Sequence, residues 1–551
     1  MSYVQIEYKG KEYSVNRGST AFELFSKIDI ALKPIALRWN NQLTSLHTPL
    51  IAGGTLEPVD LNSSAGHRVY RKSLCFLLEK AERELFPKKP LHIGPSMGDG
   101  YLFFPESETD HFSPKEIEKL KTHMLEDIAS DQPFLVKTLC YTEALRRFEA
   151  QNQTDTRLLL SERNEALVPC IQCGDYWDLM HFPLAPSAAS VGLFDLLPYH
   201  GGLLLHFPGK SLPLTLSPFV EKPLLTSIFH EYKRWGRIME VPSVPHLNQI
   251  SSSKEISRFI QVAETFQEKK ISQLADQIYE RREQVRVVLI AGPSSSGKTT
   301  FTKKLAIHLQ VCGLAPRMIS LDDYFLNRED TPKDAEGKYD FEALEALDRD
   351  TLNRNLVDLL AGKEVSTPHF DFSTGTRRET GGPPLRLASR EILMIEGIHG
   401  LNDALTPLIP KEKKFRIYIS ALTQLNLDNH NRISTTDNRL IRRLVRDYQF
   451  RGYSALHTLQ MWPSVRRGED KNIFPHQDSA DGVFNSSLDY ELSVLRTIAI
   501  PLLKTVQPIE KEYTTALELL HFLENFTPID PKHVPLHSLL REFLGDSGFK
   551  Y

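Results

Sequence analysis

The chain has 551 residues, of which 41% are hydrophobic and 25% are charged, and its formal net charge is -4. This length exceeds what one hydrophobic core usually supports, so we expect several domains. The near-neutral balance excludes a chain-wide electrostatic attraction to nucleic acid or to anionic membranes.

We expect no targeting or membrane segment in this sequence. Its first residues, Met1–Tyr8, lack a basic region followed by an apolar stretch, so we expect no signal peptide. No window approaches the roughly 18 uninterrupted apolar residues of a membrane helix. Five scattered cysteines favour reduced thiols over a disulfide framework. These features predict a cytoplasmic protein without membrane contact.

Residues 1–62 predict a small β-rich domain. Val4, Ile6 and Tyr8 alternate with polar residues, which is typical of a half-buried strand. The stretch Thr20–Glu23 has a capping-box pattern that opens a short helix, and a second strand pair flanks Asn40-Asn41. Two strands, a helix and further strands predict a β-grasp arrangement.

The middle of the chain predicts an α+β domain over residues 63–245. Apolar residues recur at helical spacing from Leu74 to Leu85, and Gly201–Pro208 is a short apolar strand between proline-rich loops. Residues 246–284 contain a long segment at helical spacing, which we interpret as a helical linker to the next domain.

Residues 285–525 alternate between short apolar strands and helical stretches. The predicted strands are 285–290, 318–321, 392–395 and 415–419, and a predicted helix covers 301–309. This alternation predicts an α/β domain with a parallel sheet and helices on both faces. The last residues, 526–551, predict a helical appendage around 536–544.

The strongest motif is Gly292-Pro-Ser-Ser-Ser-Gly-Lys-Thr299, which fits G-x-x-x-x-G-K-[ST] between a strand and a helix. Its backbone amides and the helix N-terminus suit nucleotide phosphates. We expect Lys298 to reach the β- and γ-phosphates and the Thr299 hydroxyl to bind Mg²⁺. The candidate ATP-binding residues are Gly292, Pro293, Ser294, Ser295, Ser296, Gly297, Lys298, Thr299 and Thr300.

Acidic residues follow two of the predicted strands. Asp322 and Asp323 end the strand 318–321, where a carboxylate beside the γ-phosphate can accept the proton of an attacking hydroxyl. A solvated pair that caps a helix is the alternative. Glu396 ends the strand 392–395, the usual place of a metal partner, and an incidental strand-end glutamate is the alternative.

Five arginines lie on one predicted helix and its exit. They are Arg439, Arg442, Arg443, Arg446 and Arg451. Spacings of three and four place at least two on one face, which suits a lid that neutralises a transferring phosphate. An exposed basic helix face is the alternative.

In this order, the motifs resemble the uridine kinase/phosphoribulokinase family of P-loop kinases over residues 285–506. The further matching stretches are Ser320–Phe325, Tyr339–Phe341, Pro368–Phe372, Arg377 and Glu396–Ile398. The resemblance implies that Asp322 is the catalytic base and that Asp340 binds ribose hydroxyls. It also implies that Phe370, Phe372 and Arg377 belong to the acceptor site, and that Arg443, Arg446 and Arg451 close over the phosphates.

The chain departs from that family where the base of a nucleoside would bind. Uridine kinases carry a tyrosine at the position of Phe370, a histidine at Gly375 and an arginine near Tyr453. A site that selects a base by hydrogen bonds needs such polar groups. The resemblance therefore implies transfer to a sugar-like hydroxyl and leaves uridine as the acceptor in doubt.

The N-terminal part resembles other proteins. Residues 1–62 resemble a TGS domain, and residues 63–230 resemble the editing-type domain of threonyl-tRNA synthetases. The matching stretches are His67–Arg71, Ile93–Tyr101 and Asp178–Pro183. The editing pocket of those enzymes uses four polar residues; His67 retains the first, and Arg71, Met180 and Leu184 replace the other three, so we expect no ester hydrolysis. Cys170 and Cys173 have zinc-like spacing, but without a second ligand pair we expect ordinary thiols.

Two functions follow as hypotheses. One is an ATP- and Mg²⁺-dependent kinase of a nucleoside-like or other polyol small molecule. The other is an NTP-dependent regulator that contacts RNA, tRNA or the ribosome through residues 1–245. Retention of Asp322, Asp340 and the arginines together favours the kinase, because a simple switch needs no acceptor site. The sequence leaves the oligomeric state open, a homo-oligomer included.

Overall fold

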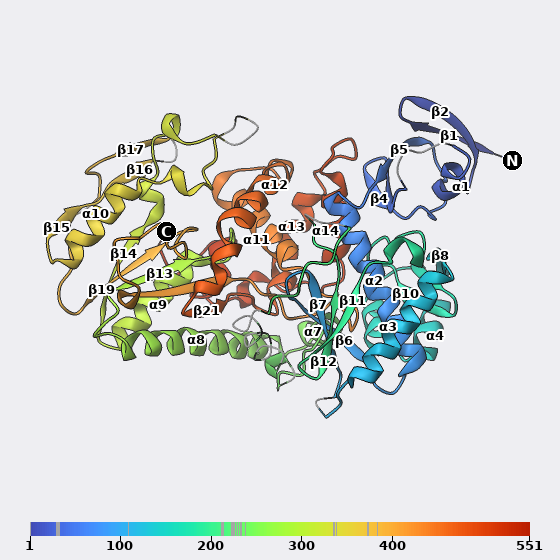
Figure 1. Ribbon diagram of the computed structural model, residues 1–551, viewed down its shortest axis with the longest axis horizontal. Coiled ribbons are helices and arrows are strands. Elements are labelled where there is room, and N and C mark those ends of the chain that lie inside the picture. Colours follow the sequence, from blue (N-terminus) through green and yellow to red (C-terminus); the bar gives the residue numbers. More distant parts are fainter. Residues whose placement is uncertain are drawn as a thin grey trace.

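The computed structural model describes residues 2–28, 33–107, 109–210, 214–221, 226, 229, 231, 234–236, 238–333, 337, 339–371, 374–382 and 384–550. The N-terminal and C-terminal parts of the chain lie side by side (Figure 1). Across these ranges, the chain contains no helix that is long and apolar enough to cross a membrane.

The first residues form a five-stranded mixed sheet with one short helix, which confirms the β-grasp arrangement. The strands lie in the order β2-β1-β5-β3-β4. Their bounds are β1 (Tyr3–Tyr8), β2 (Lys11–Asn16), β3 (Ala36–Trp39), β4 (Gln42–Thr44) and β5 (Gly54–Val59). The Thr20 hydroxyl accepts a hydrogen bond from the Glu23 amide and caps α1 (Ala21–Phe25). Asn40 and Asn41, with φ of 50° and 59°, turn the chain between β3 and β4.

The next region is α+β and is built around the long helix α2 (Ser64–Leu85). Ser63 caps this helix by accepting from the Gly66 amide, so α2 begins well before the predicted Leu74. The strands form two antiparallel sheets, ordered β10-β9-β8 and β11-β12-β7-β6. The elements are β6 (Leu91–Ser96), β7 (Gly100–Pro105), α3 (Pro114–Ala129), β8 (Leu135–Cys140), α4 (Tyr141–Ala150), α5 (Thr154–Ser161), β9 (Leu167–Cys173), β10 (Tyr176–Leu179), β11 (Asp195–Tyr199), β12 (Gly202–His206) and α7 (Val244–Ser251).

The C-terminal part is built on a five-stranded parallel sheet, which confirms the predicted α/β core. Its order is β14-β19-β13-β20-β21. The strands are β13 (Val287–Ala291), β14 (Ala315–Ser320), β19 (Glu391–Glu396), β20 (Lys414–Ser420) and β21 (Gly482–Asn485). Every residue of the central strand β13 is buried, as its unbroken apolar run predicts. Strand β21 was not predicted from the sequence because Gly482 and Asn485 leave it only two apolar residues.

Helices cover this sheet. The predicted linker is α8 (Ile256–Glu280), and its buried Ile271, Leu274 and Ile278 pack into the same core as the sheet. Because α8 lies against α9 (Lys298–Val311) and β21, it is part of this core. The other elements are α10 (Arg349–Leu360), β15 (Glu364–Ser366), β16 (His369–Asp371), β17 (Thr376–Arg378), β18 (Pro384–Arg386), α11 (Thr435–Arg451), α12 (Ala455–Asn472), α13 (Glu491–Leu503) and α14 (Tyr513–Leu523).

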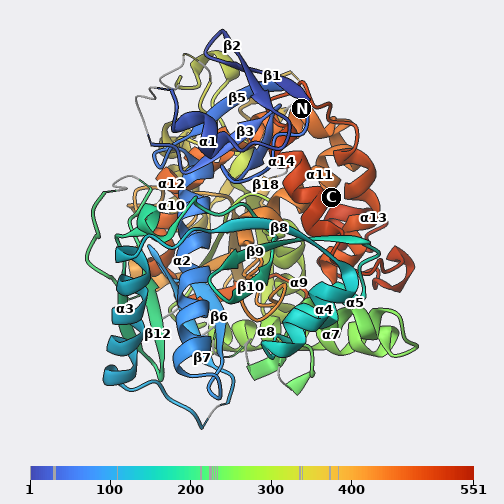
Figure 2. The same cartoon turned by 90° about the vertical axis from the view of Figure 1, so that its right-hand side faces the viewer.

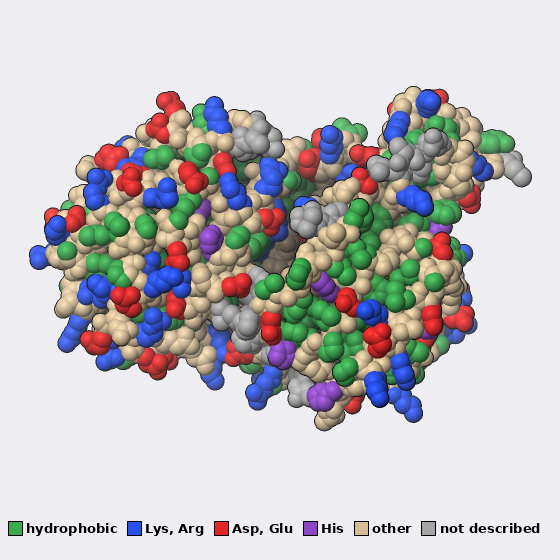
Figure 3. Space-filling view, viewed as in Figure 1, with side chains coloured by type: hydrophobic (Ala, Val, Ile, Leu, Met, Phe, Trp, Pro, Cys, Tyr) green, Lys and Arg blue, Asp and Glu red, His purple; other side chains and the backbone are tan. Residues whose placement is uncertain are grey.

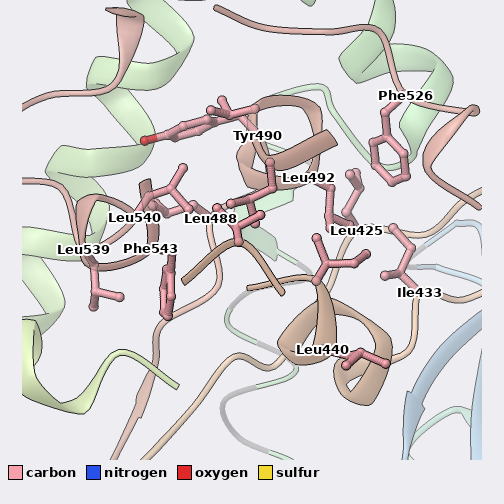
Figure 4. Close-up of a cluster of buried hydrophobic side chains, with 14 of the residues drawn as sticks. Leu425, Ile433, Leu440, Leu488, Tyr490, Leu492, Phe526, Leu539, Leu540 and Phe543 are labelled. Atoms are coloured by element: carbon pink, nitrogen blue, oxygen red, sulfur yellow. The ribbon is translucent and has the colours of Figure 1, made fainter. Parts of the chain in front are cut away.

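The last residues are less helical than predicted. Among the described residues 526–550, only α15 (Arg541–Leu544) and a 3₁₀ turn, Pro531–His533, are regular. Leu539, Leu540 and Phe543 are nevertheless fully buried, in the cluster that also holds Leu440 of α11 (Figure 4). The apolar spacing that suggested a helix therefore comes from turns that direct side chains into the core.

Helix α14 is also the docking point of the N-terminal residues. The Thr514 hydroxyl donates to the Asn41 carbonyl at 2.5 Å, and Arg68 of α2 forms an ion pair with Glu518 at 2.8 Å. Figure 2 shows the β-grasp sheet above α14 and α2. The β-grasp unit and α2 thus each make a polar contact with α14.

Candidate nucleotide and phosphoryl-transfer site

The P-loop joins β13 to α9. Gly297 has φ of 83°, a conformation that glycine adopts without strain, and Ser295 also has a positive φ of 58°. The Lys298 ammonium group donates to the Gly292 and Pro293 carbonyls at 2.9 and 3.1 Å, so it folds back over the loop. This is the cradle of backbone amides and one lysine that the motif predicts.

The acidic residues predicted at the strand ends converge on this loop. The Thr299 hydroxyl donates to the Glu396 carboxylate at 3.1 Å, which places the two candidate metal ligands together. Asp322 lies on a single 3₁₀ turn, Leu321–Tyr324, after β14, and its charge acts on both Lys298 and Glu396. The charges of Asp322 and Glu396 thus both act on Lys298, and Thr299 joins them through Glu396.

Burial shifts the pKa values of the side chains at this site. It raises the pKa of Glu396 to about 7; Lys298 opposes this shift and Asp322 adds to it. Desolvation in the cleft also raises the pKa of Asp322, although its side chain remains accessible to water. Burial lowers the pKa of Lys298. A divalent cation would favour the charged form of the two carboxylates, and a polyphosphate would favour the charged form of Lys298.

The residues present fit Mg²⁺. Mg²⁺ prefers oxygen ligands and is commonly bound through few side chains together with substrate phosphates. Thr299 and Glu396 offer a hydroxyl and a carboxylate oxygen, at the end of the loop that holds the phosphates. These two residues would hold the ion, which would neutralise phosphate charge.

The arginine helix α11 serves two purposes. Arg439 and Arg442 are buried and paired, with Glu469 and Glu491 at 2.5 Å. Arg439 also donates to the Ser294 carbonyl and Arg442 to the Ser295 carbonyl. These two arginines therefore hold the backbone of the P-loop in position.

The other three arginines surround one carboxylate. Arg443 and Arg451 contact Asp447 at 2.5 and 3.2 Å, and the Arg443 guanidinium also donates to the Ser294 hydroxyl at 2.8 Å. Burial, together with the charges of Arg443 and Arg451, lowers the pKa of Arg446 to about 10. Three cations around one anion leave an excess of positive charge beside the P-loop, which suits a phosphate.

The predicted acceptor residues differ in how far their side chains are available to a bound acceptor. The Asp340 carboxylate accepts from the Glu342 amide and is half-buried. Phe370 is buried against Phe325, with ring centroids 5.7 Å apart. Arg377 is already paired with Asp348 and Glu379, so it holds its own loop together. Phe372 lies outside the described residues.

Sequence reasoning missed three glutamates at the site. Glu469 of α12 accepts from the Ser294 amide at 2.9 Å. Burial raises the pKa of Glu342 to about 7, and the charges of Lys298 and Arg443 act on it. Glu542, near the C-terminus, contacts Thr300 of α9. Glu342 directly follows the matching stretch Tyr339–Phe341 and could have been found there, whereas no motif marks Glu469 or Glu542, which lie far from the loop in sequence.

The N-terminal region shows no editing-type constellation at the predicted positions. His67 bonds to the Pro208 carbonyl at 2.7 Å, and Arg71 stacks on Tyr101 and Phe207. A cavity of about 20 Å³ beside Asp178 is instead lined by other side chains; of the four predicted positions only Leu184 lines it.

The two cysteines with zinc-like spacing lie in one strand, β9, three positions apart. Because side chains alternate across a strand, they point to opposite faces. Cys170 belongs to the core shared with the C-terminal part, whereas Cys173 belongs to the core of the α+β region. The pair cannot bind one metal ion.

Known proteins resemble the two parts of this chain separately. Residues 287–493 match the model of the Phosphoribulokinase / Uridine kinase family. The threonine–tRNA ligase of Desulforamulus reducens is 32% identical over 194 residues, which cover 35% of this chain and 30% of that protein. The ligase of Aquifex aeolicus is 27% identical over 234 residues, or 42% of this chain and 34% of that protein.

The inorganic pyrophosphatase TTM2 of Arabidopsis thaliana is 35% identical over 130 residues, or 24% of this chain and 18% of that protein. The chain thus spans about a third or less of the length of these curated relatives. Among solved structures, a possible uridine kinase from Bacillus stearothermophilus is 20% identical, with a TM-score of 0.26 over 39% of this chain and 98% of that one. The YGR205w protein is 17% identical, with a TM-score of 0.27 over 37% of this chain and 88% of that one.

The C-terminal part of the chain therefore contains a domain of the phosphoribulokinase/uridine kinase family, a P-loop kinase domain, and the N-terminal region is similar to threonine–tRNA ligases.

Proposed function

We propose that the C-terminal domain transfers the γ-phosphoryl group of ATP to a hydroxyl group of a small sugar-like molecule. The observation that carries this proposal is the position of Asp322, beside Lys298 and Glu396 at the carboxyl ends of the parallel strands. A carboxylate there can accept the proton of a hydroxyl that attacks the γ-phosphate. A nucleotide switch has no need of such a group.

Each side chain has a role in this reaction. Lys298 and the amides of the P-loop hold the phosphates, and Thr299 and Glu396 would hold Mg²⁺, which would neutralise phosphate charge. Asp322 orients and deprotonates the acceptor hydroxyl. Arg443, Arg446 and Arg451 carry the positive charge that stabilises the transferring group. Most of the catalysis then comes from positioning and charge neutralisation.

The acceptor side combines one carboxylate with an apolar aromatic wall. Asp340 offers a carboxylate to hydroxyl groups, while Phe325, Phe341 and Phe370 form an apolar wall. At Gly375 a larger side chain would overlap Arg328, which fills the space where uridine kinases carry a histidine. We therefore propose a nucleoside-like or other polyol acceptor and do not assign uridine.

The test is ADP release with Mg-ATP against a panel of nucleosides, pentoses and inositols. One acceptor should raise the rate above that with water, and Asp322→Asn should lower kcat by about 10²–10⁴-fold. Asp330→Asn makes the same change at an exposed site and should leave the rate within twofold. If no acceptor raises the rate, or if both variants behave alike, the proposal is wrong.

A second candidate rests on the likeness of the N-terminal region to threonine–tRNA ligases. It is an NTP-dependent regulator that contacts RNA, tRNA or the ribosome. Basic and acidic side chains are interspersed on the face shown in Figure 3, which gives this face no basic tract for a phosphate backbone. Binding of the full chain to tRNA that weakens with salt, without any stimulating acceptor, would favour this candidate.

A further inference from the structure

A carboxylate of the chain itself occupies the phosphate-binding end of helix α9. The Glu542 carboxylate accepts from the Thr300 backbone amide at 3.0 Å and from the Thr300 hydroxyl at 2.7 Å. Thr300 belongs to the first turn of α9, whose free amides and partial positive charge are the groups that bind nucleotide phosphates. One anion is therefore already in place where a polyphosphate is expected.

The residues around Glu542 hold it there. Leu539 packs directly on Gly297, where a Cβ atom would overlap the Leu539 side chain. Lys304 donates to the His537 carbonyl at 2.7 Å, and Arg541 donates to the Pro531 and Val534 carbonyls. We refer to residues 536–545 as the C-terminal segment.

The charges around Glu542 are those that a phosphate would meet. Burial lowers the pKa of Lys298 and of Lys303, and the Glu542 carboxylate acts against both shifts. Its charge also acts on Arg446 and on Glu396. Phe543, the next residue, lies under the Arg442 guanidinium at 5.0 Å from the ring centroid. The segment thus contacts the loop, α9 and the arginine helix together.

We propose that the C-terminal segment competes with nucleotide for the P-loop, with the Glu542 carboxylate in the place of a nucleotide phosphate. Nucleotide binds only when the segment withdraws, so the chain restrains its own active site. This inference rests on the proposed nucleotide-dependent function. It gives a function to an acidic side chain that occupies a site suited to nucleotide phosphates.

The competition raises the apparent dissociation constant of the nucleotide. When only a fraction of molecules has a free site, the apparent dissociation constant rises by the inverse of that fraction. A charge-assisted hydrogen bond at a helix N-terminus changes such an equilibrium by on the order of tenfold or more. The buried Leu539, Leu540 and Phe543 strengthen the closed form further.

The experiment measures ADP binding to the full chain by calorimetry in the presence of Mg²⁺. Glu542→Gln keeps the size of the side chain but removes the charge, and it should bind ADP about tenfold more tightly than the natural chain. Asp546→Asn makes the same change at an exposed position of the same tail and should stay within twofold. Thermal melts confirm that both variants fold.

Hydrogen exchange of the natural chain gives a second measure that needs no variant. Saturating ADP should increase exchange of the amides of residues 536–545 and slow exchange in the P-loop. Inorganic pyrophosphate, which lacks the base and ribose, should have the same effect because the competition concerns phosphate. Unchanged or slower exchange in residues 536–545, or equal ADP affinity of Glu542→Gln and the natural chain, would overturn the inference.

The outcomes separate this inference from the proposed function. Tighter ADP binding by Glu542→Gln without any stimulating acceptor supports the competition and refutes the kinase. Equal ADP affinity in all three proteins, together with a stimulated reaction, supports the kinase and refutes the competition. Absence of ADP binding in all of them refutes both.

Discussion

Replacement of Glu469 should weaken the contacts that connect the P-loop to helices α11 and α12. Its side chain is 1% exposed and is paired with Arg439 through both oxygens, at 2.5 and 2.8 Å. It also accepts from Arg466 and from the Ser294 amide of the P-loop. Although burial opposes ionisation, these partners lower the pKa of Glu469. One carboxylate thus satisfies two cations and one loop amide.

The magnitude follows from the buried charge that the substitution leaves behind. Removal of one partner of a buried ion pair costs roughly 3–5 kcal/mol, because the other charge stays buried and unpaired. Glu469→Gln should therefore lower the melting temperature by on the order of 10 °C. It should also weaken ADP binding, since glutamine has one acceptor oxygen and the Ser294 amide must share it with Arg439. Replacement of Arg439 and Glu469 together by methionine removes both charges and should recover most of the lost stability.

The assay is thermal unfolding of the two variants beside a matched control. Asp470→Asn lies next in sequence and is 56% exposed, and it should shift stability by less than about 0.5 kcal/mol. A melting temperature of Glu469→Gln within 2 °C or so of the control would refute the reasoning. A double variant less stable than Glu469→Gln would show that packing, and not the unpaired charge, sets the cost.

Three further predictions concern the site and the cysteines. Glu396→Gln should raise the Mg²⁺ concentration needed for half-maximal ADP release by at least about tenfold, measured by titration with Mg²⁺; an unchanged Mg²⁺ requirement would contradict the metal role. Because a base acts when deprotonated and desolvation raises the pKa of Asp322, kcat/KM should increase with pH through a limb above the ordinary range of aspartate. A rate that is flat through that range would exclude Asp322 as the base. Metal analysis should find no stoichiometric zinc bound by Cys170 and Cys173, and zinc lost in a Cys170→Ser variant would contradict their separation.

The sequence predicted the elements whose signals are local. The P-loop is recognised because its glycines, lysine and threonine stand at fixed spacing between a strand and a helix. The turn at Asn40-Asn41 and the cap at Thr20 depend on residues within three or four positions. Strand β13 is an unbroken apolar run, and the parallel sheet follows from such strands alternating with helices. Each of these features is decided by neighbours along the chain.

The sequence did not predict features that depend on distant contacts. The apolar spacing from Leu536 to Leu544 suggested a helix, but only four residues are helical because the segment is shaped by the core into which it packs. Nothing near Glu542 in sequence marks it as a partner of Thr300, which lies 242 positions away. Contacts of this separation become visible only in the folded chain.

The arginine helix shows where sequence reasoning reaches its limit. Helical spacing predicted that at least two of Arg439, Arg442, Arg443 and Arg446 share a face, yet it could not divide them by role. Arg439 and Arg442 are neutralised by glutamates 30 and 49 positions away, whereas the cations around Asp447 outnumber their carboxylate. An arginine cluster is available to a phosphate when its positive charge exceeds the negative charge of the carboxylates it contacts. The partners, rather than the basic pattern, therefore decide which arginines serve the site, and the same reasoning makes Glu542, an anion at an anion site, the residue of greatest interest.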